Sequence, residues 1–149
     1  WSSGFEELIQ LDPAARENLI VGSNYYYTID NPDNKKFVEA YKKKFKGVPP
    51  GYAGAAGYGL MKMTLLGMQK SGSTEPQKVI TALEEHKGKN FVGDFEIRGR
   101  NHQTVRPFFV LQTKKKSEMK NKYDMAEVVD ISSTEQPKNI NMCKDIGSF

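Results

Sequence analysis

The sequence predicts an α/β fold, in which helices and strands alternate along the chain. A β-rich run at 19–25 precedes three helical segments, and near residue 91 the period of the apolar residues changes from that of a helix to that of a strand. The 149 residues correspond to about one domain, and 38% hydrophobic with 27% charged residues is typical of a globular protein. One strand run before three helices is too little sheet to cover them, so we expect strands from outside this chain.

The first predicted elements are a short helix and a strand. FEELIQL (5–11) is interpreted as a helix that stops at Asp12-Pro13. LIVGSNY (19–25) is an apolar run that leads into aromatic residues, a composition with strong β preference. The sequence therefore predicts a strand over roughly 19–25.

A second helix is predicted after Asn31-Pro32-Asp33, which is a helix-start signal. Its apolar residues at i, i+1, i+4 and i+8 share one face, with lysines opposite. They are Phe37, Val38, Tyr41 and Phe45. Gly47 closes this helix, and Pro49-Pro50 prevents its continuation.

The third predicted helix covers about 52–70, with Gly72 after it, and it contains Gly54, Gly57 and Gly59. Glycine is a poor choice inside a helix, because it costs roughly 1 kcal/mol per residue relative to alanine. We expect these glycines to allow close backbone approach, either by a ligand or by a neighbouring helix.

A fourth helix is predicted to begin at Thr74-Glu75-Pro76-Gln77, which has the spacing of a capping box. Its buried stripe is Val79, Ile80 and Leu83. His86 and Lys87 suit the dipole at its C-terminal end, and Gly88 is expected to end it.

The last third of the chain predicts strands. FVGDFEI (91–97) alternates apolar and acidic residues, and PFFVLQT (107–113) follows after a polar turn. A proline at the first position of a strand is tolerated. MAEVVDI (125–131) is a candidate third strand, and residues 132–149 are polar and expected to cover a surface.

The net charge of +4 comes largely from Lys42-Lys43-Lys44 and Lys114-Lys115-Lys116. Acidic residues are interleaved and Arg is scarce, which favours solvated lysines over a nucleic-acid interface. We therefore expect no nucleic-acid partner. No apolar run approaches the ~18 residues of a membrane-spanning helix.

The sequence offers no catalytic set. His86 and His102 are the only histidines, and neither has Cys or carboxylate partners at metal-ligand spacing. Phosphate loops, nucleophile elbows and zinc spacings are all missing from the sequence. The pair Glu84-Glu85 is interpreted as a solvated helix face. We therefore predict neither an enzyme nor a bound cofactor.

Cys143 is the only cysteine, so the chain has no internal disulfide. It is either an inert surface thiol or one half of a disulfide whose partner lies outside the chain. The residues alone leave both interpretations open.

Aromatic residues cluster at the ends of the predicted elements. They are Trp1, Tyr25, Tyr26, Tyr27 and Tyr52. Tyr and Trp join an apolar body to a polar tip, which suits a small-molecule pocket as well as the rim of a core. Tyr52 is the strongest candidate, because the free N–H groups and positive dipole end at the start of a helix favour a carboxylate.

The segment FVEAYKKKFKGVPPGYAGAAGYGLMKMTLLGMQKSGSTEPQKVITALE shows an ordered series of features. An F-x-x-x-Y helix is followed by a proline, an aromatic residue that opens an Ala-rich helix with an internal Tyr, a Gly-Ser turn and a V-x-x-A-L helix. Further matches are Phe91-Val92-Gly93-Asp94-Phe95, His102-Gln103, Val128-Val129 and the late Cys143. In this order the chain resembles the C-terminal half of the branched-chain amino acid type of periplasmic binding protein, the type I solute receptors of ABC importers.

The resemblance implies a longer, two-lobed protein with three-layer α/β lobes that the chain crosses three times. Residues 1–24 would then end the second lobe, 25–113 would form the C-terminal part of the first lobe, and 114–149 would cross the hinge and return to the second lobe. The N-terminal portion of the same protein would supply the missing strands.

The resemblance also implies the function and the site. It predicts an extracytoplasmic, periplasmic receptor that delivers a small amino acid or an organic or aromatic carboxylate to the permease of an ABC importer. A ligand-sensing domain of a receptor or regulator is the alternative. Tyr52 matches a ligand-contacting aromatic residue, Trp1 falls near a cleft-lining position, and Tyr25 would complete the wall. Cys143 would pair with an upstream cysteine, as is usual in an oxidising compartment.

Overall fold

The computed structural model describes residues 4–99 and 101–134. The helices are α1 (Phe5–Leu8), α2 (Pro32–Lys44), α3 (Tyr52–Ser71) and α4 (Pro76–Leu83), with 3₁₀ turns at Pro13–Arg16 and Lys116–Glu118. The strands are β1 (Ile20–Ser23), β2 (Lys87–Asn90), β3 (Gly93–Ile97), β4 (Thr104–Val105), β5 (Pro107–Thr113) and β6 (Ala126–Ser133). Trp1, Cys143 and most of the segment 132–149 lie outside the described residues.

The strands form two small sheets, with orders β1-β5-β6 and β2-β3-β4. Every strand pair in the described residues is antiparallel. β5 is the central strand of the first sheet, and the chain between β1 and β5 contains both long helices and the second sheet. The mixture of helix and sheet confirms the predicted α/β class.

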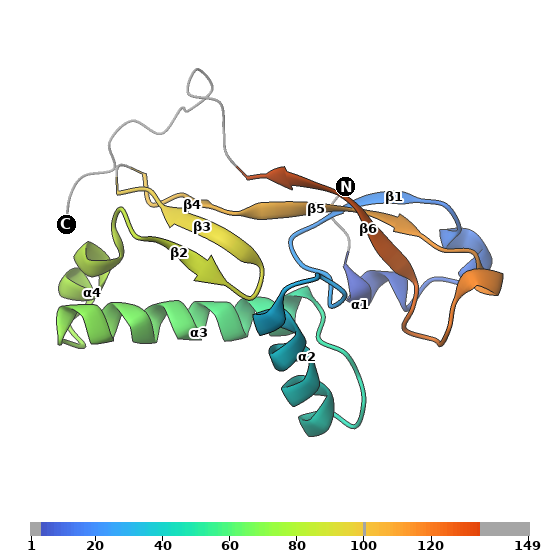
Figure 1. The fold of residues 1–149 in the computed structure, drawn as a ribbon, viewed down its shortest axis with the longest axis horizontal. Helices are drawn as coiled ribbons and strands as arrows, with labels where there is room; N and C mark the ends of the chain where they lie inside the picture. Colours follow the sequence, from blue (N-terminus) through green and yellow to red (C-terminus); the bar gives the residue numbers. More distant parts are fainter. Residues whose placement is uncertain (1–3, 100, 135–149) are drawn as a thin grey trace, which may run out of the picture.

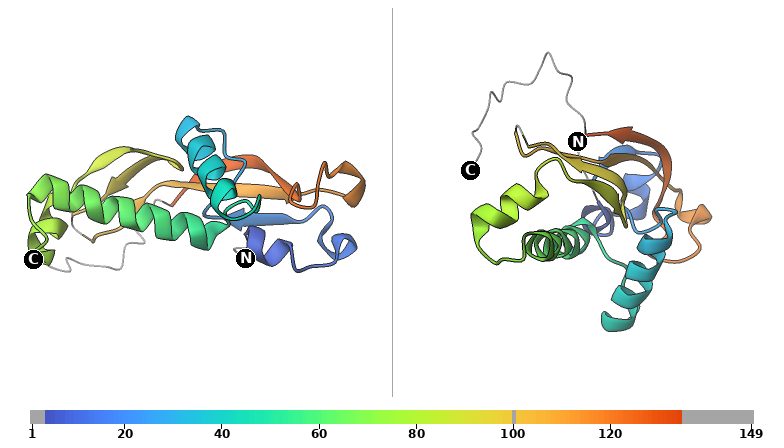
Figure 2. Two further views of the ribbon diagram at one scale, coloured as in Figure 1. Left: turned by 90° about the horizontal axis from the view of Figure 1, so that it is seen from below. Right: turned by 60° about the vertical axis from the view of Figure 1, so that its left-hand side comes forward.

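Figure 1 shows α3 running along the β2-β3 hairpin, with α4 folded back at its C-terminal end. α2 projects away from the sheets near the start of α3, a position that is also visible in both views of Figure 2. α1 lies near the start of α3, on the side of the first sheet. The start of α3 is therefore a junction between α1 and α2.

Apolar and aromatic side chains from the helices, the strands and the loops between them form one core. In β5 alternate residues are buried, and Phe109 and Leu111 are 1% and 0% exposed. An aromatic group extends this core towards α3, where Phe37 stacks on Tyr58 with ring centroids 4.4 Å apart and Phe91 approaches Tyr25 at 5.8 Å. Offset and edge-on contacts of this kind are favourable between aromatic rings.

The glycines of α3 are explained largely by packing. A Cβ at Gly54 would lie 3.1 Å from the Tyr41 ring of α2, and one at Gly59 would lie 3.3 Å from Phe91. Gly67 meets α4 even more closely. Only at Gly57, of the three that we singled out, is there nothing within 4 Å. Close approach by neighbouring elements is therefore the reason for Gly54 and Gly59.

Two predictions near α4 were wrong. The helix ends at Leu83 rather than Gly88, because Glu84 leaves it with ψ 139° and Glu85 takes a positive φ of 56°. Lys87–Asn90 then pairs with β3 as a strand. Thr74 does not cap the helix either, since Glu75 is the N-cap residue and its N–H binds the Ser73 hydroxyl at 3.0 Å.

One face of α3 exposes large apolar side chains. Leu60, Met61 and Leu65 are 69%, 61% and 55% exposed. Among the described residues, no helix combines the length and the apolar character that crossing a membrane requires.

Candidate functional site at the start of α3

The start of α3 is fixed by the residues before it. Pro49 and Pro50 are buried and cannot continue a helix, and Gly51 is the N-cap residue in an extended conformation with φ −90° and ψ −175°. Tyr52 is the first helical residue, and its side chain is 43% exposed. An aromatic side chain is thus presented at the positive end of a 20-residue helix.

The start of a helix favours a carboxylate, and here a residue of the same chain supplies it. Glu6 of α1 accepts a hydrogen bond from the Tyr52 N–H on Oε2 and another from the Ala53 N–H on Oε1, each at 3.2 Å. These N–H groups have no partner inside the helix, and a carboxylate is also favoured there by the helix dipole. Glu6 therefore caps α3 with both of its oxygens.

Two glycines make this contact possible. A Cβ at Gly51 would overlap the carboxylate of Glu6, so only glycine leaves room for it. A Cβ at Gly4 would lie 3.0 Å from Cδ1 of Tyr52. The Tyr52 ring therefore lies beside the backbone at Gly4, and α1 approaches the start of α3 through positions that lack side chains.

Helix α1 is anchored in the core by the two residues that flank Glu6 and Glu7. These residues, Phe5 and Leu8, are 5% and 1% exposed. The Phe5 ring contacts those of Tyr27 and Tyr123 at centroid distances of 6.0 and 5.7 Å. Glu7 accepts a hydrogen bond from the Gly4 N–H at 2.8 Å, which caps α1 itself.

The structure places the three predicted ligand-contacting residues, Tyr52, Trp1 and Tyr25, in different settings. Tyr52 lies at the helix start as expected, and Trp1 lies outside the described residues, three positions before Gly4. Tyr25 is 3% exposed and its hydroxyl donates to Asn34 Oδ1 at 2.8 Å. Burial raises the pKa of Tyr25 well above its ordinary range. In this structure Tyr25 is a core residue, and it does not present a surface to a ligand.

The two histidines have structural partners. His102 Nε2 lies 2.9 Å from Glu84 Oε1, and His86 Nδ1 lies 2.8 Å from Lys70 Nζ. Within residues 4–99 and 101–134, no group of three or more His, Cys, Asp or Glu side chains is placed to hold a metal ion. The histidine contacts are thus those of loops and helix ends.

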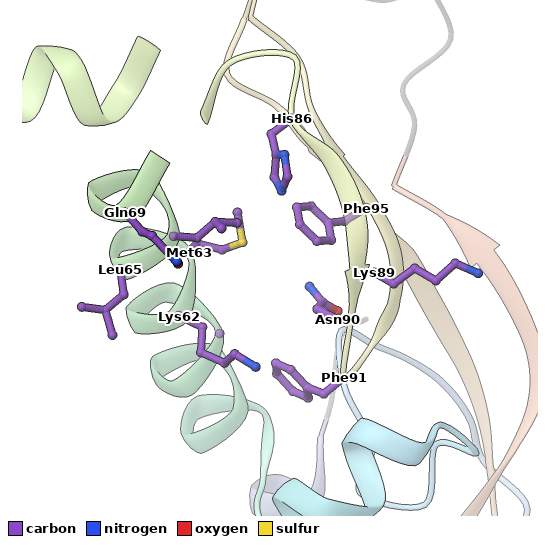
Figure 3. A pocket seen from close by; sticks show the side chains of 11 residues that line it. Lys62, Met63, Leu65, Gln69, His86, Lys89, Asn90, Phe91 and Phe95 are labelled. Atoms are coloured by element: carbon purple, nitrogen blue, oxygen red, sulfur yellow. The ribbon is translucent and has the colours of Figure 1, made fainter. Parts of the chain in front are cut away.

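A hollow lies between α3 and the β2-β3 hairpin, with a volume of about 340 Å³ (Figure 3). Lys62, Phe91, Phe95 and His86 point towards it. It is lined mainly by apolar groups of the two elements that it separates. Its lining also includes polar side chains, among them Lys62, Gln69 and His86.

Sequence reasoning missed Glu6, the residue that completes the helix start. Its neighbours in the sequence, Phe5 and Glu7, give no sign of a partner 46 residues away. The one available signal was Gly51 directly before Tyr52, because a glycine at an N-cap permits close approach without supplying a cap of its own.

Comparison with known proteins agrees with this fold. A family model described as "Periplasmic binding protein" matches residues 1–118. The chain belongs to this family of solute-binding proteins. No curated protein matches the sequence significantly.

Solved structures give the same result. An amino acid ABC transporter substrate-binding protein from Pseudomonas fluorescens Pf-5 is 28% identical over 93% of this chain, with a TM-score of 0.85. An ABC-type branched-chain amino acid transporter protein from Rhodopseudomonas palustris CGA009 is 25% identical over 80%, with a TM-score of 0.67. A solute-binding protein from Rhodopseudomonas palustris BisB5, solved with 3,4-dihydroxybenzoic acid, is 23% identical over 75%, also with a TM-score of 0.67.

This chain spans only about a third of those solved proteins. The covered share is 36%, 32% and 31% of their lengths, respectively. They are therefore more than twice as long as the chain.

Proposed function

We propose that this chain is part of an extracytoplasmic solute-binding protein, which holds a small amino acid or an organic or aromatic carboxylate between two lobes. It would deliver this ligand to the permease of an ABC importer on the periplasmic side. The observation that carries the proposal is the exposed ring of Tyr52 at the capped start of α3, beside Gly4. Family membership supports a binding role.

The proposed lobes follow the segments 1–24, 25–113 and 114–149. Each segment contributes one strand to the β1-β5-β6 sheet, which is consistent with a region where the chain crosses between lobes. The N-terminal portion of the same protein would cover Leu60, Met61 and Leu65, since α3 exposes them and a helix in a three-layer lobe packs on a sheet. It would also supply the parallel strands of that sheet.

In the proposed site, Tyr52 forms one wall beside Gly4. Trp1 is proposed as a second wall residue because the resemblance places it near a cleft-lining position. Tyr25 is left out, since its hydroxyl and ring are committed to the core. Cys143 would form a disulfide with a cysteine outside this chain. An aromatic wall of this kind suits an apolar or ring-bearing part of a ligand.

Isothermal calorimetry of the intact protein against a panel of amino acids and aromatic acids tests the proposal. We expect at least one tight binder, and Tyr52→Ala should weaken it by about tenfold or more, since a buried aromatic contact is worth upwards of about 1.4 kcal/mol. Phe45→Ala is a matched control, because Phe45 is an aromatic residue of similar exposure (45%) at the end of α2. Equal affinities for both variants would refute the role of Tyr52.

A further inference from the structure

The backbone donors at the start of α3 are already occupied. Glu6 takes the N–H groups of Tyr52 and Ala53 with its two carboxylate oxygens. A ligand carboxylate beside Tyr52 would have to compete for the same two donors. It would also be repelled by the negative charge of Glu6, so the usual advantage of a helix N-terminus for anions is lost here.

The Glu6 contact is built into the local backbone on both sides. Gly51 leaves the space that the carboxylate fills, and Gly4 lets the Tyr52 ring lie against the chain just before α1. Phe5 and Leu8 anchor α1 in the core, so Glu6 reaches α3 from a fixed base. An occupant supplied in this way is always present at the site, whatever the ligand concentration.

We propose that Glu6 is a specificity-determining residue, which keeps carboxylate groups away from the start of α3. The part of the ligand that contacts Tyr52 is then uncharged or positively charged. A carboxylate elsewhere on the ligand is held by groups other than the N–H donors of Tyr52 and Ala53. This inference rests on the proposed function, since it concerns the ligand of the same site.

The test follows the amide signals of Tyr52 and Ala53 by NMR in the intact protein, labelled with ¹⁵N at Tyr and Ala, during addition of sodium acetate. In the wild type we expect both signals to stay in place. In Glu6→Ala both should move and reach saturation, because the two donors are free to bind acetate. Glu6→Gln keeps an oxygen for one donor, so it should show a smaller movement of the same signals.

Glu39→Gln is the matched control, because it removes the same charge from an exposed position on α2. It should behave as the wild type does. Movement of the wild-type signals equal to that in Glu6→Ala would overturn the proposal, because Glu6 would not be holding the donors. A lack of response in both Glu6 variants would overturn it as well. Glu6→Gln preserves the shape of the side chain and gives the answer if Glu6→Ala does not fold.

Failure of this inference and failure of the proposed function are distinguishable. The acetate experiment reads two backbone amides and needs no natural ligand, so it gives its result even if the calorimetric panel contains no binder. Conversely, a tight binder in that panel would support the proposed function even if acetate affected the wild type and the Glu6 variants equally.

Discussion

Gly67 of α3 lies directly against Val79 of α4, and a Cβ at Gly67 would be 2.7 Å from Val79 Cγ1. The same Cβ would be 3.0 Å from Leu83. This glycine therefore sets how closely the two helices pack. Gly54, Gly59 and Gly67 each lose helix propensity but permit a close contact with a neighbouring element.

A pair of glycine variants separates these two effects. Gly67→Ala should destabilise the protein by about 1–3 kcal/mol, because the methyl group would push α4 away from α3. Gly57→Ala should instead stabilise it by up to about 1 kcal/mol, because alanine is the better helix former. The space around Gly57 is open, with nothing within 4 Å of an added Cβ.

Urea unfolding followed by circular dichroism measures both changes. Similar effects of the two substitutions, in either direction, would show that the Gly67 contact does not control the packing of α4.

Asp124 links two loops near the 3₁₀ turn that follows β5. Burial favours the neutral acid, but hydrogen bonds from Lys114 Nζ (2.7 Å) and the Lys120 N–H (3.1 Å), with their positive charges, outweigh it and hold the pKa of Asp124 below its ordinary 3.8. The ionised form is therefore favoured by folding. The stability that it contributes is present above pH 3.8 and is lost as the pH falls through the lowered pKa.

We expect Asp124→Asn to remove this part of the acid dependence and to reduce the free energy of unfolding at neutral pH. Thermal unfolding between neutral and strongly acidic pH measures both. Asp130→Asn, at an exposed carboxylate on β6, is the control and should leave the acid dependence almost unchanged. An identical pH profile for Asp124→Asn and the wild type would contradict this interpretation.

His86 makes a contact that holds it in the neutral form. The Lys70 ammonium can only donate, so Nδ1 of His86 accepts at 2.8 Å and the ring proton lies on Nε2. Partial burial and then the charge of Lys70 lower the pKa of His86 below 6.5. The stability gained is present above pH 6.5 and is lost as the pH falls through the lowered value.

Lys70→Gln should raise the pKa of His86 part of the way towards 6.5, since burial remains. NMR titration of the imidazole signals measures it. Lys36→Gln on the distant α2 removes an equal charge and should have no effect. A pKa of His86 that does not change in Lys70→Gln would show that the contact is not maintained in solution.

The elements that depend on local signals could be predicted from the sequence. Asn31 caps α2 by accepting from the Asp33 N–H at 2.9 Å, and Gly72 ends α3 with φ 61°, both as their residue types predict. The bounds of α3 differ from the predicted ones by a single residue at its C-terminal end.

Elements that depend on distant partners were harder to predict. Lys87–Asn90 has no strand pattern of its own and becomes β2 because β3 lies opposite. The pairing of Glu6 with the start of α3 joins segments that no local pattern connects. In the candidate site, the sequence predicted that the start of α3 at Tyr52 favours a carboxylate, but it could not show that Glu6 of the chain itself supplies one.

The proposal that the protein closes two lobes around a small molecule can be measured by small-angle X-ray scattering. The intact protein would be compared with and without a saturating amount of the tightest binder from the calorimetric panel. We expect the radius of gyration to decrease on binding, because a ligand between the lobes favours the closed state. An unchanged scattering curve at full occupancy would contradict closure of two lobes.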